Sequence, residues 1–75
     1  MVKFWTVVDE KKFSDGSVKA SATVKANRAL AESAYYTILA EAAADGSPYH
    51  AAYILEANRG VIESKIYDRS EAADG

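Results

Sequence analysis

The chain has 75 residues, of which nine are Lys or Arg and eleven are Asp or Glu, giving a formal net charge of −2. It has no cysteine, which excludes disulfides, thiolate metal sites and cysteine nucleophiles, so stability must come from a packed core. The acidic balance argues against nucleic acid and membrane surfaces as partners, and no apolar segment approaches the roughly 20 residues of a membrane span. We expect one soluble, cytoplasmic domain.

A first strand is expected over residues 2–9, because apolar residues recur there at every second position. Both of its faces are apolar, and the sequence leaves open which face meets the core. We assume the arrangement in which the even-numbered residues lie under a helix. The set assumed to lie under the helix is Val2, Phe4 and Val8, and the opposite set is Trp5 and Val7.

The charged run of residues 9–12 is predicted to be a solvated loop. After it, Ser14-Asp15-Gly16 predicts a type I turn in which Gly16 takes the left-handed backbone conformation and closes a hairpin. The second strand of this hairpin is expected over residues 18–25, with one apolar and one polar side. The apolar side, which we predict to be buried, consists of Val18, Ala20, Ala22 and Val24.

A helix is expected over residues 28–45, a segment without proline or glycine, with Asn27 as its N-cap and Gly46 at its end. Small side chains along one side would let this helix lie close to a sheet. Tyr36 and Leu39 are expected on its flank, at the edge of the core. The predicted buried stripe consists of Leu30, Ala31, Ala34, Tyr35, Ile38 and Ala42.

Residues 49–56 and 61–68 predict two further strands, joined through residues 57–60, in which Gly60 repeats the role of Gly16. The third strand is apolar on both sides, which favours a central position or a sheet that is covered on both faces. The side of the fourth strand that is expected to face the helix carries Ile62, Ser64 and Ile66.

These elements predict an α+β fold, a four-stranded sheet with one helix packed on one face, in the order ββαββ. Residues 1–68 form the single predicted domain, and residues 69–75 are expected to be a flexible tail. Two topologies remain open. In a β-grasp the first and fourth strands pair in parallel at the centre, whereas in the other layout the hairpins meet differently across the helix. The first and third strands look central, and they are not the central pair of a β-grasp.

Residues 4–8, the turn at residues 15–16, the tyrosine pair 35–36 and the segment 48–54 resemble small uncharacterised proteins of gut Firmicutes and their prophages. The resemblance extends over nearly the whole chain. It implies a cytoplasmic accessory protein of unsettled role, of the kind that a mobile element makes to bind a host factor.

The layout of hairpin, helix and hairpin, with the turn at residues 13–17, also resembles the protein L-like β-grasp domains of bacterial surface proteins, which bind immunoglobulins. This resemblance is one of layout and turn chemistry, without a diagnostic motif. It implies a β-grasp fold, and it makes immunoglobulin binding a minor option.

His50, the only histidine, is expected to be a partly exposed strand residue. A general-base role would need a nucleophile and an orienting carboxylate beside it, and the spacing selects no such set. One imidazole among scattered carboxylates also lacks the ligand clusters of metal sites, so neither a metal nor a cofactor is predicted. The candidate neighbours of His50 are Ser47, Ser64, Asp45 and Glu56.

Aromatic side chains carry the functional prediction, because Trp and Tyr anchor many protein interfaces and a helix-free sheet face that carries them would form an apolar patch. The alternative is that they complete a small core. We predict a non-enzymatic interaction module that binds another protein, or forms a homodimer, through the open sheet face or the strand edges. A phage-derived inhibitor of a host protein and a small ligand-binding domain are the alternatives. The predicted contact residues are Trp5, Tyr53, Lys65 and Tyr67, with Tyr36 contributing from the helix.

Overall fold

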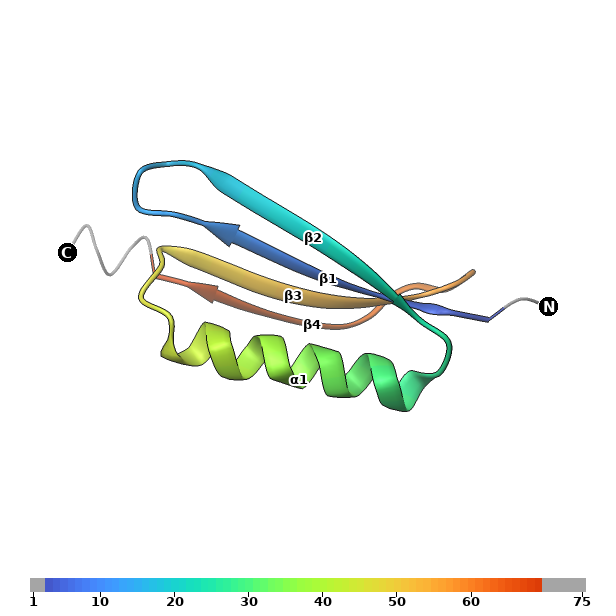
Figure 1. Cartoon of the computed structure of the whole chain (residues 1–75). Helices are drawn as coiled ribbons and strands as arrows, with labels where there is room; N and C mark the ends of the chain where they lie inside the picture. The colour runs from blue at the N-terminus through green and yellow to red at the C-terminus, as the bar shows by residue number, and fades with distance from the viewer. Residues whose placement is uncertain (1–2, 70–75) are drawn as a thin grey trace.

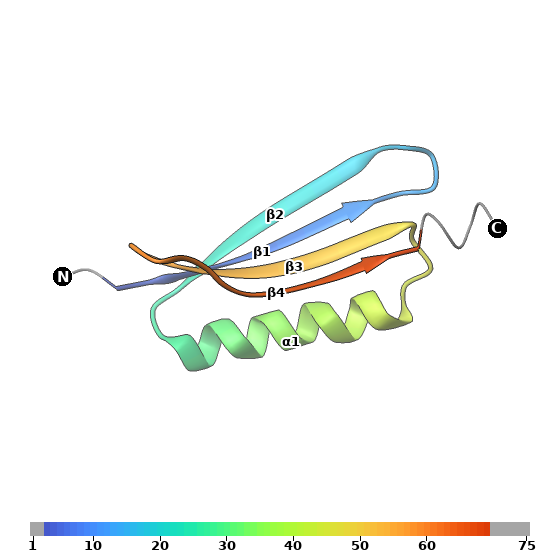
Figure 2. The same ribbon diagram turned by 180° about the vertical axis from the view of Figure 1, so that it is seen from behind.

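The computed structural model describes residues 3–69. Its one helix lies along one face of a four-stranded sheet (Figure 1), and Figure 2 shows the same two layers from behind. The predicted α+β class and the ββαββ order are confirmed. In chain order the elements are β1 (Trp5–Lys12), β2 (Val18–Lys25), α1 (Arg28–Ala44), β3 (Tyr49–Glu56) and β4 (Gly60–Asp68).

The four strands are antiparallel to their neighbours and are ordered β2-β1-β3-β4 across the sheet. The central strands are β1 and β3, in agreement with the apolar residues on both of their sides. Because β1 and β4 are not neighbours, the β-grasp alternative, which pairs them in parallel, is wrong. β2 and β4 form the two edges, and α1 lies mainly over β3 and β1.

The first hairpin is closed by the turn that the sequence predicts. Gly16 has a φ of 92°, and its N–H donates to the carbonyl of Phe13 at 3.0 Å. The carboxylate of Asp15 accepts a hydrogen bond from the Ser17 hydroxyl at 2.6 Å and from the Ser17 N–H at 2.8 Å, and these two bonds lower the pKa of Asp15. This local network fixes the pairing register of β1 and β2.

The charged run of residues 9–12 is not a loop, as predicted, but the second half of β1. Its backbone pairs with β2 on one side and with β3 on the other throughout. The charges are tolerated there because they alternate between the two faces, where neighbouring polar groups or solvent are available to each. Asp9 and Lys11 lie on the helix side, and Glu10 and Lys12 lie on the other side.

Both ends of α1 have side chains that satisfy free backbone groups. The Oδ1 atom of Asn27 accepts a hydrogen bond from the Leu30 N–H at 2.9 Å, which confirms the predicted N-cap. At the other end, Arg69 donates to the carbonyl of Ala42 at 2.9 Å and to that of Ser47 at 3.4 Å. Arg69, predicted to belong to the tail, is therefore part of the folded unit, because its guanidinium binds carbonyls near the end of the helix. The rest of the predicted tail lies outside the described residues.

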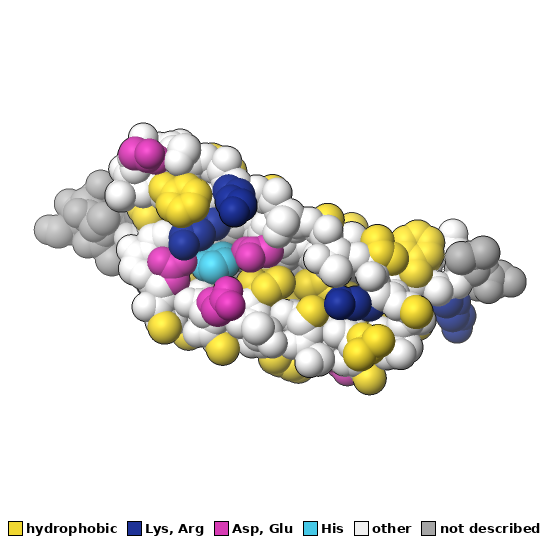
Figure 3. All heavy atoms as spheres, in the orientation of Figure 1, with side chains coloured by type: hydrophobic (Ala, Val, Ile, Leu, Met, Phe, Trp, Pro, Cys, Tyr) yellow, Lys and Arg dark blue, Asp and Glu magenta, His cyan; other side chains and the backbone are white. Residues whose placement is uncertain are grey.

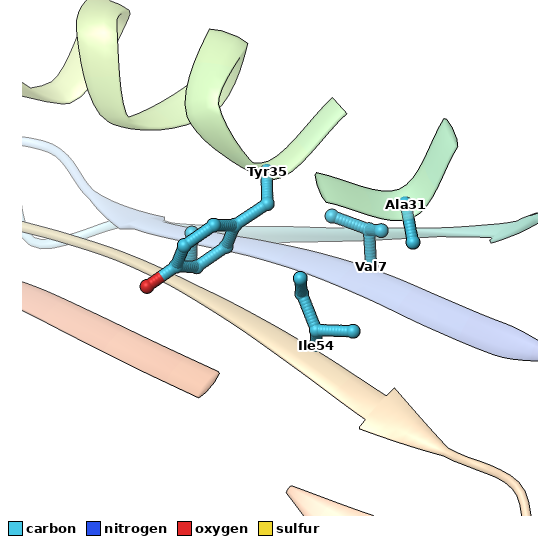
Figure 4. Packing of buried hydrophobic residues seen from close by; sticks show 5 residues of the cluster. Val7, Ala31, Tyr35 and Ile54 are labelled. Carbon is cyan, nitrogen blue, oxygen red and sulfur yellow. The ribbon is translucent and has the colours of Figure 1, made fainter. Parts of the chain in front are cut away.

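The core lies between α1 and one face of β1 and β3 (Figure 4). Ala31 and Tyr35 of α1 pack on Val7, Ala52 and Ile54 of the sheet. Small residues at the contact let the helix approach closely, since Ala31 and Ala52 are fully buried. Around this centre pack the partly buried Trp5, Ala34, Ile38, Leu39 and Ile62.

The buried residues of the helix are Ala31, Tyr35 and Ala42, and all three belong to the predicted stripe. Ala34 and Ile38 of the same stripe are partly buried and pack against the core. Leu39, expected at the edge of the core, packs against it, whereas Leu30, expected to be buried, is exposed.

The assumed orientation of the first strand is wrong. Val7 and Trp5 face the helix, and Phe4 and Val8 face away from it. Directly opposite residues of an antiparallel ladder share a face, and Val7 lies opposite Ile54. β3 has an alanine on each face, but Tyr49 and Tyr53 lie on the face away from the helix, and the pairing with β3 sets the orientation of β1. Val2, the remaining member of the assumed set, lies outside the described residues.

The predicted burial of β2 is also wrong. Thr23 lies opposite Val7, so the polar side of β2 faces the helix layer and its apolar side faces away. Both sides are exposed along nearly the whole strand, because α1 lies over the central strands and contributes little cover to this edge. The exposed apolar side chains are Val18, Ala20, Ala22 and Val24.

In β4 the prediction holds for one of three residues. Ile62 packs against the core, but Ser64 and Ile66 lie opposite Tyr53 and Ala51, on the side away from the helix. The strand register shifts between Ile54 and Leu55 of β3, which marks a bulge near Ile62 in β4. A bulge interrupts the simple alternation on which the prediction depends.

Candidate functional site

The side of the sheet away from α1, here called the open face, is an exposed apolar surface. Val18 is 69% exposed, Val24 62%, Val61 57% and Ile66 49%, although all four are aliphatic. They come from both edge strands, so the exposed surface spans the sheet rather than one strand. An apolar surface of this kind commonly marks a site of protein contact. The apolar residues of the open face are Phe4, Val8, Val18, Ala20, Ala22, Val24, Ala51, Tyr53, Leu55, Val61 and Ile66.

Two tyrosines lie along the β3 row of the open face. The hydroxyls of Tyr49 and Tyr53 are 3.3 Å apart, so the two side chains lean toward each other across Ala51, which is buried despite its place on this face. The hydrogen bond with Tyr49, followed by one with Glu10, raises the pKa of the Tyr53 hydroxyl. Tyr53 is thus on the predicted surface, with its polar end already bonded within the chain.

The outer edge of β2 borders the open face. β2 is regular over its eight residues, pairs with β1 on one side only, and is exposed at every residue except Lys25. It contains no proline and no bulge, which are common devices that prevent an edge strand from accepting another strand, and its charged residues are Lys19 and Lys25. The β4 edge differs, since the bulge near Ile62 interrupts it.

Three of the five predicted contact residues lie on the helix side instead. The indole Nε1 of Trp5 donates to the carboxylate of Glu56 at 3.1 Å, and its ring packs against the core. Two cations lie over the ring of Tyr67, with the Lys65 ammonium 5.5 Å and the Arg69 guanidinium 5.3 Å from its centre. These aromatic groups are used in contacts within the chain, and they are not available to the open face.

Tyr36, predicted to contribute from the helix, is 57% exposed on α1. Its ring meets the edge of the Tyr35 ring, with the ring centres 5.3 Å apart. The structure therefore does not bring it together with Tyr53, which lies on the opposite side of the sheet. The residues that sequence reasoning missed are the aliphatic ones of β2. The alternation of these residues with polar ones was visible in the sequence, but it was interpreted as evidence that the apolar side of the strand is buried.

A second feature is a charged cluster around His50, which is buried rather than partly exposed as predicted. Its Nε2 lies 2.7 Å from Oδ1 of Asp9, and its Nδ1 lies 3.2 Å from Oδ2 of Asp45. The Nζ atom of Lys11 lies 2.7 Å from the same Asp45 oxygen. The hydrogen bond with Lys11, followed by that with the N–H of Ser47, holds the pKa of Asp45 well below its usual range.

This cluster forms one wall of a hollow of about 470 Å³ between the end of α1 and the first hairpin. Figure 3 shows the single histidine of the chain between acidic and basic side chains on this side of the molecule. Phe13 and Ser21 contribute from the hairpin, and the ammonium of Lys11 lies 4.9 Å from the centre of the Phe13 ring. The hollow exists because the helix side of β2 is uncovered.

The chemistry of this cluster is that of a hydrogen-bonded charge network. Both ring nitrogens of His50 face carboxylates, and in the described part of the chain no serine hydroxyl bonds to either nitrogen. The network joins β1, β3 and the segment after α1, so it ties together three parts of the fold. Of the candidate neighbours of His50, Asp45 is in contact with it, whereas Ser64 faces away from the helix and Glu56 bonds to Trp5. Asp9 was missed because its segment was predicted to be a loop.

Comparison with known proteins found no matching family model, no matching curated protein and no matching solved structure. Within residues 3–69, no helix combines the length and the apolar character needed to cross a membrane. Over the same residues, His, Asp and Glu side chains do not gather in a group of three or more that could hold a metal ion.

Proposed function

We propose that the protein is a small, non-enzymatic interaction module that associates with a second copy of itself through the β2 side of its sheet. One observation carries the proposal. β2 is exposed on both faces and has a free outer edge, although every second side chain in it is apolar. An edge strand of this kind is a ready template for pairing with another chain.

A second copy is the occupant that fits best. The apolar side chains of β2 are short, and the alanines among them keep the surface flat. A flat strand of short apolar side chains suits contact with an identical strand, because backbone hydrogen bonds supply much of the attraction and the side chains need only pair without steric clash or charge repulsion. The net charge of −2 gives little repulsion between copies. Most oligomers of soluble proteins are likewise built from identical chains with two-fold symmetry.

Concentration-dependent mass measurement tests the proposal. In sedimentation velocity, we expect the wild-type protein to pass from the monomer mass of 8.1 kDa to twice that mass over the micromolar range. Val24→Glu places a charge on the exposed side of β2 and should remain monomeric, with an unchanged circular dichroism spectrum. Leu30→Glu is the matched control, because Leu30 is also an exposed aliphatic residue, lies on α1, and should leave the dimer intact when replaced.

A wild-type protein that stays monomeric up to about 1 mM, where even weak specific pairs form, would overturn the proposal. So would equal loss of the dimer in Val24→Glu and Leu30→Glu. The phage-derived inhibitor remains the alternative in which the same surface meets a different protein. It is favoured over self-association if the purified chain is monomeric but binds one host protein in equal amounts and loses it in Val24→Glu.

A small ligand-binding domain is the second candidate, and the hollow beside His50 favours it. Its volume of about 470 Å³ is in the range of small-molecule sites. Lys19 on one wall and Glu41 on the other have no ion pair within the described residues, so a ligand that carries both charges would find partners there. Melting curves recorded with zwitterionic metabolites test this candidate, and a rise that Glu41→Gln abolishes would support it.

A further inference from the structure

The outer edge of β2 offers free backbone groups at alternate residues, and the hairpin identifies which ones. The N–H of Phe13 donates to the carbonyl of Ser17, its direct counterpart across the hairpin. In an antiparallel ladder this pattern recurs at every second residue, so the odd-numbered residues of β2 bond to β1. The even-numbered residues therefore point their N–H and C=O groups outward. They are the same residues whose apolar side chains lie on the open face.

The other side of β1 gives an independent check of this alternation. The N–H of Ala57 donates to the carbonyl of Phe4, so the even-numbered residues of β1 bond to β3. The odd-numbered residues of β1 are then left to bond to β2, as the hairpin requires. The outward direction of the even-numbered residues of β2 follows from both observations.

The residues of β2 are symmetric about Ser21. Alanine lies one residue away on each side of Ser21, and valine lies three residues away on each side. Only the positions between them differ, with Lys19 on one side and Thr23 on the other. A two-fold axis through Ser21 of an antiparallel strand pair would bring each residue opposite the one at equal distance on the other side.

We infer that two copies pair edge to edge through β2, with the two-fold axis at Ser21. The inference rests on the proposed function and specifies the contact that forms the dimer. Val18 then lies opposite Val24 of the second copy, and Ala20 lies opposite Ala22 of the second copy. All of the outward-pointing backbone groups of β2 find partners, and like side chains meet on the open face. The result is one continuous sheet of eight strands.

Neighbouring registers are less favourable. An axis at Ala22 places Lys19 opposite Lys25 of the second copy, and like charges that lie directly opposite are destabilising. It also leaves Val18 without a strand residue opposite it. An axis at Ala20 leaves Val24 unpaired in the same way. The axis at Ser21 is the one that pairs both valines and keeps the lysines apart.

The helices do not obstruct this arrangement. An antiparallel pair with two-fold symmetry keeps both helices on the same side of the continuous sheet. Each α1 lies mainly over β3 and β1 of its own copy, so four strand spacings separate the two helix axes. At about 4.8 Å per spacing the axes are about 19 Å apart, which exceeds the diameter of about 10–12 Å of a helix with its side chains.

The chain has no cysteine, so a single introduced cysteine can form a disulfide only with its counterpart in a second copy. We expect Ser21→Cys to form a covalent dimer under mild oxidation. The two sulfur-bearing residues would face each other across the axis at a Cα distance of about 4.5 Å, which a disulfide can bridge. The control is Ser33→Cys, the same substitution on the exposed surface of α1. Crosslinking of Ser21→Cys should be at least about tenfold faster, since pairing raises the effective concentration.

The register and the self-association fail in distinguishable ways. Fast crosslinking of Ser21→Cys, together with crosslinking of mixed Lys19→Cys and Thr23→Cys chains but of neither variant alone, supports the inferred register. A dimer by sedimentation in which Ser21→Cys reacts no faster than Ser33→Cys overturns the register and leaves the self-association in place. A dimer in which Ala22→Cys is the fast variant overturns it in favour of the shifted register. A protein that is monomeric throughout overturns both.

Discussion

Both faces of the sheet carry apolar side chains, but only one of them is covered by α1. Beneath α1, small Ala52 lies beside Ile54 and Val7, and the helix meets this face with Ala31. On the open face, valines, isoleucine and leaning tyrosines stand on a surface that no element of the described chain covers. Apolar content therefore does not decide burial in this protein, because the open face carries more apolar residues than the covered face and several of them are exposed.

The largest expected difference between the faces is in the free energy of unfolding after truncation of isoleucine. Ile54→Ala should destabilise the fold by about 2–5 kcal/mol, because it removes a fully buried side chain and leaves a cavity. Ile66→Ala, the same change on the open face, should cost less than about 1 kcal/mol, because Ile66 is already half exposed. Urea unfolding in the monomeric Val24→Glu background measures both. Equal losses would contradict the assignment of the faces.

A smaller effect is expected from the charge network at the end of the covered face. His50→Ala should reduce the free energy of unfolding by about 1–3 kcal/mol, because Asp9 and Asp45 lose a hydrogen-bonding partner. Lys12→Ala, at an exposed residue of the same hairpin, should change it by less than about 0.5 kcal/mol. Thermal unfolding monitored by circular dichroism distinguishes the two variants. A His50→Ala protein as stable as Lys12→Ala would mean that the network does not hold the elements together.

The same network predicts a dependence on pH. The folded-state pKa of Asp45 is lowered, chiefly by its hydrogen bond with Lys11, from the ordinary aspartate value of 3.8 that applies in the unfolded chain. The stabilising contribution of Asp45 is therefore fully present above that value and is lost as the pH falls toward the folded-state pKa. Asp45→Asn should show a shallower loss of stability than the wild type between about pH 4 and pH 2.

Lys11→Met provides the complementary measurement. Removal of the ammonium takes away the largest cause of the shift, so the pKa of Asp45 should move back toward its ordinary value. Titration of the Asp45 carboxyl carbon by NMR measures this directly. An unchanged titration curve would show that the backbone N–H of Ser47 alone holds the carboxylate.

The smallest effect on folding is expected on the open face itself. Val24→Thr replaces one methyl group with a hydroxyl of similar size at a residue that is 62% exposed. The monomer should change in stability by less than about 0.5 kcal/mol, while the dimer weakens because the hydroxyl would be partly desolvated there. Sedimentation equilibrium measures the dimer and chemical unfolding measures the monomer. A large loss in the monomer would indicate that Val24 is part of a core.

The contrast between the faces also explains which predictions failed. β2 has a clean alternation of apolar and polar residues, and this pattern is typical of a strand with one buried side. The alternation correctly predicts the strand and its bounds, but it cannot report where the helix lies. The hairpin turn couples β1 to β2, and Val7 opposite Thr23 places the polar side of β2 beneath the helix layer. The apolar side is then left outside.

Trp5 and Tyr67 illustrate the same limit for single residues. Their ring chemistry suits an interface, and the sequence does not show that Glu56 accepts the hydrogen bond of the indole or that Lys65 and Arg69 lie over the phenol ring. These partners are close only across strand pairs and at the end of β4. Trp5 and Tyr67 are thus used in contacts within the chain. The exposed apolar surface of β2 is formed by aliphatic residues instead.

By itself, the sequence determined the local features: the turn closed by Gly16, the helix that begins after Asn27, the bounds of β2 and β3, and the order ββαββ. Each depends on residues near one another in the chain, where backbone preferences and short-range hydrogen bonds decide the outcome. Only the tertiary structure decided the strand order, the face that α1 covers and the meeting of His50 with Asp9 and Asp45. These features follow from close packing between segments that are distant in the chain. When both faces of a sheet carry apolar residues, the period of the sequence pattern does not show which face the helix covers.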